Sequence, residues 1–524
     1  MPKEAQTLGE LLNRIAESYL YEPALVIYEE SLSYQALAER ARSIAHRLLG
    51  SGLEIGDRVA VWIPNGTAFA ELAFGVALAG MVLVPLNTRL KSFDATETLR
   101  KSSTQALFFT ETFLGIDFFR MVQTIQASGK LPDLRLVINL GTSGSTDIRS
   151  WTRWQDETTP AKDLPSVSAE APAIINFTSG TTSSSKGAVI SHGSLLHIAR
   201  EVGLRMGISQ ADRMVSAMPF YHNGGFVPTL LTCLMFGCTL YTQPWFDPEY
   251  VLNTITRKQC TLVGGVGTMF TMMMDNPALA KADLRSLRAV RITGTADIRR
   301  VAYERFGRPM IYSLYGMTES TAAITLTCPD DTVGEQINTN GKPIPGTSLR
   351  IVGPNGEDLP PETKGEIWIN GKSLMQGYFR DPDATAQVLT SDGWLHSGDL
   401  GYVDQSGNLV FVGRIKDMYR CGGENVACPE VEEFLRSHPA VLHADVMGVP
   451  DSRLGEVGFA FVELRPSAST TCEELQAFCR ENLANFKVPH YIQFRKNLPI
   501  TASGRVIKYS LLDEALALVR EQTD

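Results

Sequence analysis

A hydroxyl-rich loop follows an apolar strand in INFTSGTTSSSKGAVISH, residues 175–192. The strand is expected to end at Phe177, and a helix is expected to begin at Ser191. The loop between them carries the side chains of Thr178, Ser179, Thr181, Thr182 and Lys186. Backbone N–H groups, hydroxyls and one lysine in a single turn can hold phosphate oxygens. The pattern favours a phosphate site over the alternative, a mobile serine linker.

Three more polar motifs follow downstream, and they contain residues suited to ligand binding. They are SLYGMTES at 313–320, LHSGDLGYVDQSGNLVFVGRIKDM at 395–418 and CGGENVACPEVEE at 421–433. Glu319 offers a hard carboxylate oxygen to a magnesium ion, and Asp399 can accept hydrogen bonds from two hydroxyls. Taken singly, Glu319 also suits a helix start, and Asp399 or Arg414 suits a turn in a glycine-rich segment.

In this order, the four motifs resemble those of the adenylate-forming superfamily, and the pattern is most similar to that of acyl-CoA ligases. The superfamily also includes the adenylation domains of nonribosomal peptide synthesis and beetle luciferases. The resemblance extends over essentially the whole chain. It implies that a carboxylic acid and ATP, with Mg²⁺, give an acyl-adenylate (acyl-AMP) and pyrophosphate. The thiol of CoA then displaces AMP after the C-terminal domain rotates.

The same resemblance implies which residues contact the nucleotide. The phosphate contacts fall to Thr178, Ser179, Thr181, Thr182 and Lys186, and the adenine lies near Thr293, Gly294, Thr295, Tyr315 and Gly316. Thr318 is implied near the α-phosphate, while Asp399 and Arg414 bind the ribose or a phosphate. Glu319 is the implied magnesium ligand, and Lys416 is the implied hinge.

Thioester formation and acyl binding are implied for a second set of residues. His222 matches the position beside the acyl carboxylate and the thiol, and Glu424 matches the acidic residue that approaches it after rotation. Gly422 and Gly423 would leave room for the pantetheine arm of CoA, and the alternative is that they form an ordinary turn. The implied acyl site comprises His222, Asn223, Gly224, Gly225, Phe226, Gly264, Gly265 and Met317.

Several positions depart from the family pattern, and they concern the ATP-dependent step. The pattern has a catalytic lysine where this chain has Arg505, and Lys508 follows three residues later. Arginine keeps the charge but is a planar fork instead of a compact ammonium. In the phosphate loop Ser183 replaces a glycine and Ser185 a proline, and Thr293–Thr295 replaces Gly-Gly-Ala.

These departures suggest a ligase that has a weakened or lost adenylation step and that transfers the acyl group of a preformed acyl-AMP to CoA. A separate adenylating enzyme would then supply the adenylate. The alternative is a complete ATP-dependent acyl-CoA synthetase in which Arg505 or Lys508 acts for the lysine. A further alternative is a catalytically silent protein that binds acyl-AMP or a partner protein.

The acyl group is expected to lack an α-amino group and to be bulky. An aspartate that would pair with a substrate ammonium is missing from MPFYHNGGFVPT, residues 218–229. Glycines in HNGGF and in VGGVGTMF, 263–270, remove side-chain volume and suggest a roomy apolar pocket. The alternative is that these glycines serve turns, and that Phe226, Met269 and Phe270 close the cavity.

The elements that must position these motifs are read from the hydrophobic pattern. Amphipathic helices alternate with short β-rich runs over about residues 1–335, which predicts two doubly wound α/β subdomains. Short runs separated by Gly, Pro, Asn and Asp at about 336–412 predict a small β-barrel. Together, residues 1–414 form the predicted N-terminal domain, 415–416 the hinge, and 417–524 a mobile α+β C-terminal domain.

Composition narrows the class of protein further. The net charge of −9 argues against a nucleic-acid partner. The longest apolar run, 72–86, is too short to span a bilayer and is expected to form a packed helix followed by a buried strand. The N-terminus lacks an apolar signal segment, and the eight cysteines lack close C-x-x-C pairs and are expected to be reduced. A cytoplasmic location is therefore expected.

Overall fold

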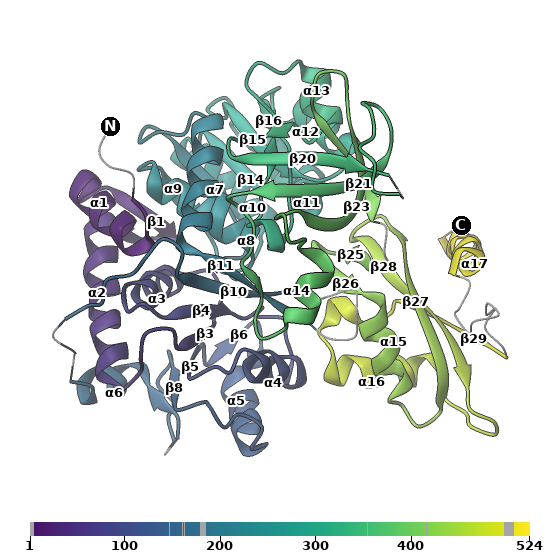
Figure 1. Cartoon of the computed structure of the whole chain (residues 1–524), viewed down its shortest axis with the longest axis horizontal. Helices are drawn as coiled ribbons and strands as arrows, with labels where there is room; N and C mark the ends of the chain where they lie inside the picture. The colour runs from purple at the N-terminus through teal and green to yellow at the C-terminus, as the bar shows by residue number, and fades with distance from the viewer. Residues whose placement is uncertain are drawn as a thin grey trace. The chain divides into compact units, whose positions relative to one another are not determined.

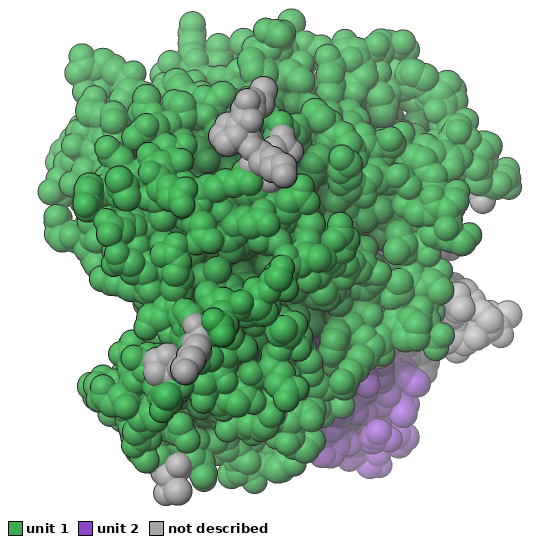
Figure 2. Space-filling view, turned by 60° about the vertical axis from the view of Figure 1, so that its left-hand side comes forward, with its two compact units in different colours: residues 1–88, 99–176, 187–413 green, residues 89–98, 177–186, 414–524 purple. Residues whose placement is uncertain are grey.

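The computed structural model describes residues 5–145, 147–159, 161, 163–178, 185–353, 355–414, 418–496 and 508–523 (Figure 1). The chain divides into two compact units, coloured in Figure 2. The large unit comprises Met1–Thr88, Leu99–Asn176 and Gly187–Gly413. The small unit comprises Arg89–Thr98, Phe177–Lys186 and Arg414–Asp524.

A seven-stranded sheet in the order β16-β15-β14-β12-β13-β1-β2 carries several predicted site residues. Every neighbouring pair is parallel except β1 and β2. Its strands are short and apolar because helices cover both faces of a parallel sheet. The strands are β1 Pro23–Ile27, β2 Glu30–Ser33, β12 Arg213–Ser216, β13 Thr239–Thr242, β14 Leu262–Val266, β15 Ala289–Thr293 and β16 Met310–Tyr312.

A second sheet of eight strands has the order β22-β11-β10-β4-β3-β5-β8-β9 and includes both strands that flank the phosphate loop. The strands are β3 Arg58–Trp62, β4 Val82–Pro85, β5 Ala106–Phe109, β8 Leu136–Asn139, β9 Arg149–Ser150, β10 Pro172–Thr178, β11 Lys186–Ser191 and β22 Gly377–Tyr378. A separate hairpin pairs β6 Thr112–Phe113 with β7 Ile116–Asp117. The two mainly parallel sheets, with helices between their strands, confirm the predicted α/β class.

The helices of the large unit alternate with these strands. They are α1 Leu8–Tyr19, α2 Tyr34–Gly50, α3 Thr67–Leu78, α5 Phe118–Ala127, α6 Trp151–Glu157, α7 His192–Arg205, α10 Pro248–Lys258, α11 Gly267–Asp275, α12 Ala296–Arg305, α13 Val333–Asn338 and α14 Pro382–Val388. Helix α4, Ser92–Lys101, spans the boundary between the units.

The apolar run at 72–86 forms α3 and the buried strand β4, as predicted. Figure 1 shows α3 beside α2, and a Cβ at Gly75 would lie only 2.6 Å from Ile44 Cγ2. The two helices therefore pack closely because residue 75 has no side chain. None of the helices in the described ranges is long and apolar enough to cross a bilayer.

Strands β20, β21, β23 and β24 lie in the region predicted as a small β-barrel and form one sheet in that order. A three-stranded sheet, β17-β18-β19, reaches that region only with β19, because β17 and β18 precede residue 336. The strands are β17 Leu314–Tyr315, β18 Thr325–Leu326, β19 Lys342–Pro343, β20 Thr347–Val352, β21 Gly365–Gly371, β23 Leu395–Val403 and β24 Leu409–Arg414. No disulfide joins any of the eight cysteines, all of which the structure describes.

The small unit is an α+β structure with its own apolar core. Its elements are β25 Met418–Cys421, β26 Glu424–Ala427, α15 Cys428–Arg436, β27 Val441–Asp451, β28 Gly455–Leu464, α16 Cys472–Asn482, β29 Tyr491–Arg495 and α17 Lys508–Thr523. Lys487 is buried in this unit and donates hydrogen bonds to Glu430 at 2.6 Å and to Asp94 at 3.3 Å. The two carboxylates supply counter-charges to a lysine that has left water.

His192 makes the large unit sensitive to acid. Its side chain is fully buried, its Nδ1 accepts a hydrogen bond from the Leu8 N–H at 3.3 Å, and burial lowers its pKa to about 4. The unfolded chain binds this proton near pH 6.5, so stability is present above pH 6.5 and is lost as the pH falls toward 4. We expect the free energy of unfolding to be about 2 kcal/mol lower at pH 5 than at pH 7 from this residue alone.

Denaturant unfolding of the His192→Asn variant at pH 5 and pH 7 tests this expectation. Asparagine keeps an acceptor for Leu8 but has no titrating group, so this variant should lose most of the pH dependence, whatever its absolute stability. His443→Asn, at an exposed position of the small unit, is the control and should retain the dependence. Equal pH dependence in all three proteins would contradict the assignment.

Candidate active site

Tyr315 and Asp399 form a buried aromatic and acidic pair in the large unit, and the exposed ring of Phe411 lies against it. The Tyr315 hydroxyl donates a hydrogen bond to Asp399 Oδ2 at 2.7 Å, and both side chains are buried. The ring of Phe411 stacks on that of Tyr315, with 5.6 Å between centroids and 24° between planes. An aromatic face beside a carboxylate can bind a base and accept hydrogen bonds from ribose hydroxyls. The structure thus brings together two residues predicted to contact the nucleotide, 84 positions apart.

The turn that follows Tyr315 needs an unusual backbone. A Cβ at Gly316 would lie 2.3 Å from the Ala322 carbonyl oxygen, so only glycine fits there. Thr321 and Ala322 have φ angles of 59° and 82°, a region that side chains disfavour. The Met317 N–H donates to Ser320 Oγ at 3.1 Å. Such strain is typical of functional turns, and this one presents Thr318 and Glu319 in the short helix η3, Thr318–Ser320.

Glu319 is held by Tyr378. The Tyr378 hydroxyl donates a hydrogen bond to Glu319 Oε1 at 2.8 Å, and Glu319 is buried. Burial and the neighbouring carboxylate raise the pKa of Tyr378, so it remains a donor. The described residues contain no group of three or more His, Cys, Asp or Glu that could hold a metal. A single carboxylate nevertheless suits Mg²⁺, which takes one or two protein carboxylates and fills its other positions with phosphate oxygens and water.

Of the predicted residues, Thr293 ends β15, and Gly294 and Thr295 lie in the loop that follows. A Cβ at Gly294 would lie 3.1 Å from Gly267 Cα, so a larger residue would push the two loops apart. Arg299 braces this loop, because its Nη1 donates to the Gly294 carbonyl oxygen at 2.7 Å and to Ser313 Oγ at 2.9 Å. Sequence reasoning missed Arg299, since nothing in ADIRRVAYER marks it as the buried arginine of the pair.

The segment His222–Gly225 is tied to two other predicted motifs. His222 caps the short helix α8, Asn223–Gly225, and its Nδ1 accepts a hydrogen bond from the Gly224 N–H at 3.1 Å. The Asn223 amide donates to the Thr318 carbonyl oxygen at 3.3 Å and accepts a hydrogen bond from Asn176, on the strand before the phosphate loop. The His222–Gly225 segment and the turn at Thr318 are therefore neighbours in the large unit.

Side chains and backbone occupy the space next to the glycines of the predicted acyl site. A Cβ at Gly225 would lie 2.0 Å from the Pro219 carbonyl oxygen, and one at Gly265 would lie 3.3 Å from Met269 Sδ and 3.4 Å from the ring of Phe270. Phe226 and Phe270 are fully buried. This arrangement argues against a roomy pocket. It favours the alternative in which Phe226, Met269 and Phe270 close the cavity.

Gly422 and Gly423 form the loop of a tight hairpin in the small unit. Cys421 pairs with Glu424, and the two glycines between them have φ angles of 57° and 88°. Two positive φ angles define the hairpin turn that favours Gly-Gly. The turn by itself therefore accounts for these glycines, and their contact with CoA stays a prediction, as does the role of Glu424.

Several predicted residues lie outside the described part of the chain. They are Ser179, Thr181, Thr182, Lys416 and Arg505, together with the altered loop position Ser183. The neighbouring predicted residues fall at element ends: Thr178 ends β10, Lys186 begins β11, Arg414 ends β24 and Lys508 begins α17.

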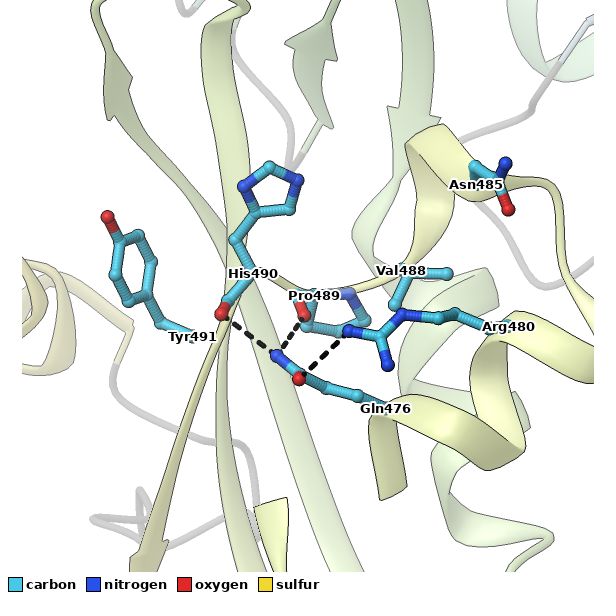
Figure 3. Close-up of a pocket in the computed structure, with 7 residues that line it drawn as sticks. All are labelled: Gln476, Arg480, Asn485, Val488, Pro489, His490 and Tyr491. Carbon is cyan, nitrogen blue, oxygen red and sulfur yellow. Dashed lines mark hydrogen bonds between the residues drawn. The ribbon is translucent and has the colours of Figure 1, made fainter. Parts of the chain in front are cut away.

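A surface hollow of about 560 Å³ lies on the small unit between α16 and β29 (Figure 3). The Gln476 amide donates to the carbonyl oxygens of Pro489 and His490 at 3.0 and 2.9 Å, and Arg480 donates to Gln476 Oε1 at 3.1 Å. These polar groups hold the chain together, and none of the predicted site residues lines the hollow.

Two family models match the chain. The model described as AMP-binding enzyme matches residues 12–379, and the model described as AMP-binding enzyme C-terminal domain matches residues 430–505. The chain belongs to the AMP-binding enzyme family. This membership confirms the resemblance to adenylate-forming enzymes.

Relatives within the family match nearly the whole chain. A 3-[(3aS,4S,7aS)-7a-methyl-1,5-dioxo-octahydro-1H-inden-4-yl]propanoyl:CoA ligase of Mycobacterium tuberculosis is 36% identical, over 98% of this chain and 99% of the relative. The mouse (Mus musculus) mitochondrial medium-chain acyl-CoA ligase ACSF2 is 32% identical, over 97% and 87%. Among solved structures, the amide bond synthetase McbA from Marinactinospora thermotolerans has a TM-score of 0.84 and 28% identity, over 96% and 99%.

Asp399→Asn should weaken AMP binding about 10- to 100-fold, because a hydrogen bond to a charged group contributes ~1.5–3 kcal/mol. Calorimetric titration of the purified protein with AMP gives the dissociation constant. Asp358→Asn, an exposed aspartate paired with Arg350, is the matched control and should bind AMP like the unmodified protein. An unchanged dissociation constant in Asp399→Asn, with the protein folded, would remove Asp399 from the nucleotide site.

Proposed function

We propose that this protein is an acyl-CoA ligase that binds an acyl-adenylate and transfers its acyl group to CoA. The thiol sulfur of CoA attacks the acyl carbonyl carbon, the bond from that carbon to the phosphate oxygen breaks, and AMP leaves with the electron pair. The buried pair Tyr315–Asp399, stacked under Phe411, carries this proposal, because it offers the contacts that the adenosine half of an acyl-adenylate needs. Relatives at 31–36% identity over nearly the whole chain are CoA ligases by name.

We propose further that the ATP-dependent first step is weakened. Arg505 in place of lysine and the serines at 183 and 185 of the phosphate loop support this. A preorganised cation at the reacting phosphate contributes ~10²–10³ in rate, and a guanidinium fork reproduces an ammonium poorly. In this proposal another enzyme supplies the acyl-AMP, and Mg²⁺ at Glu319 matters only where adenylation operates. A cytoplasmic location likewise stays a prediction.

The acyl group in this proposal is a bulky carboxylic acid without an α-amino group. The relatives from Mycobacterium tuberculosis and Rhodococcus jostii are named for a bicyclic acyl group, which supports a bulky acyl group in this proposal. Phe226, Met269 and Phe270 close the site when no acid is bound. In this proposal the long, flexible side chain of Met269 moves aside when the bulky acid binds.

Two assays on one panel of acids separate the possibilities. The first measures pyrophosphate release from acid plus ATP, and the second measures thioester formation from the matching synthetic acyl-AMP and CoA. We expect thioester formation at ordinary ligase rates and pyrophosphate release at least ~10²-fold slower. Pyrophosphate release at a matching rate would show a complete synthetase, and activity in neither assay would show a silent binding protein.

Arg505→Lys should raise pyrophosphate release by at least about tenfold, because it restores a compact ammonium where the phosphate reacts. Thioester formation from acyl-AMP should change little. Arg465→Lys, the same exchange at an exposed position of the small unit, controls for a general effect of the substitution. An unchanged rate of pyrophosphate release in Arg505→Lys would assign the slow adenylation to the phosphate loop and not to position 505.

A further inference from the structure

Arg291 is a buried arginine in the middle of β15, inside the large unit. Its guanidinium donates hydrogen bonds to the Pro228 carbonyl oxygen and to Thr229 Oγ1. Burial lowers its pKa to about 10, so the group is charged at neutral pH. No carboxylate forms an ion pair with it in the described ranges of the chain. A buried charge without a counter-charge is costly, and it therefore points to a role.

The nearest group that could become an anion does not neutralise this charge. Cys233 lies close enough to raise the Arg291 pKa when it is ionised. Burial, however, raises the pKa of the Cys233 thiol well above its ordinary value, so the thiol stays protonated and neutral at physiological pH. The described hydrogen-bond partners of Arg291 are thus the neutral Pro228 carbonyl and Thr229 hydroxyl, and the nearby Cys233 thiol is neutral too.

Both glycine-rich segments of the predicted acyl site meet at this arginine. Gly264 is the strand partner of Arg291, and a Cβ on Gly264 would lie 3.0 Å from Arg291 Nη2. On the other side, Thr229 accepts the arginine's hydrogen bond and donates its own to the Gly224 carbonyl oxygen at 3.0 Å. The guanidinium therefore lies against Gly264, which has no side chain. One residue, Thr229, links the guanidinium by hydrogen bonds to Gly224 in the His222–Gly225 segment.

The hydrogen bonds with which Arg291 supports the neighbouring helical turn use only some of its N–H donors. Pro228 lies in a π-helical turn, η1 Phe226–Leu231, between α8 and α9, Thr232–Met235. Carbonyl groups freed in this turn are taken up by Thr229, by Thr232, which donates to the Val227 carbonyl oxygen at 3.0 Å, and by Arg291. A guanidinium carries five N–H donors, and the two described hydrogen bonds leave others for a ligand.

We propose that Arg291 is a specificity residue for the acyl substrate and binds an oxygen acceptor, a ketone or a second carboxylate, on the acyl group remote from the reacting carboxyl carbon. This inference rests on the proposed function, because it concerns the same acyl site. The oxygen supplies the negative or partial charge that the protein itself does not place beside the guanidinium. A wholly apolar acid of the same size leaves the cation desolvated and unpaired, which disfavours that acid.

Three synthetic acyl-AMPs with one carbon skeleton test the proposal: one ends in a carboxylate, one carries a ketone, and one is the apolar isostere. Thioester formation with CoA gives kcat/KM for each. We expect the better oxygen-bearing substrate to exceed the isostere at least ~10²-fold, since a site built for a polar group strongly rejects the analogue without it. Equal rates, or a faster isostere, would overturn the proposal. No thioester from any substrate would instead refute the proposed function.

Substitution then assigns the preference to the side chain. Arg291→Met should reduce the ratio of oxygen-bearing to apolar substrate toward one, mainly through KM, because the oxygen-bearing substrate loses its partner and the isostere no longer faces an unpaired cation. A purely bracing arginine would lower all three rates alike. Arg300→Met, an exposed arginine on α12, is the control and should keep the ratio. Should Arg291→Met fail to fold, Arg291→Lys keeps the charge but loses the fork, and we expect it to retain part of the ratio.

Discussion

The register of the parallel strands β12, β14, β15 and β16 is the constraint on which the site depends. Ser216, Gly264, Arg291 and Tyr312 lie in one row across these strands, so the strands end together. Parallel sheets of this kind bind ligands beyond the carboxyl ends of their strands. The His222 segment, the Gly294 loop and the Tyr315 turn each begin at this edge, and a slip of one strand would separate them.

Buried polar groups then fix the loops that leave this edge. Arg299 connects the Gly294 loop to Ser313, and Asn223 connects the His222–Gly225 segment to the Thr318 turn. These hydrogen bonds satisfy the half-buried carbonyl oxygens of Gly294 and Thr318 and the buried hydroxyl of Ser313, so removing one leaves an unpaired polar group. The site is therefore a connected network and not a set of independent side chains, which explains why strained angles at Thr321 and Ala322 persist.

The sequence allowed the prediction of local features and of family, but not of these connections. The apolar run at 72–86 and the cap at Ser191 follow from periodicity and capping chemistry, and both are present. Tyr315 and Asp399 were placed together only through resemblance, because 84 residues separate them. Arg291 and Arg299 were missed, since a charged residue in an apolar strand or helix gives no periodic signal. Glycines at 224, 225, 264 and 265 suggested empty space, but neighbouring groups fill it.

The contact between Gly264 and Arg291 also limits the order in which these two positions can be substituted. With arginine in place, any Cβ at 264 would press on Nη2 at 3.0 Å, and the fully buried surroundings give the guanidinium little room to yield. With a short residue at 291, the same Cβ is relieved of its three nearest neighbours, all of which are guanidinium atoms of Arg291. The effect of a substitution at position 264 therefore depends on the residue at position 291. Enlarging residue 264 first gives a destabilised protein, whereas shortening residue 291 first avoids this clash.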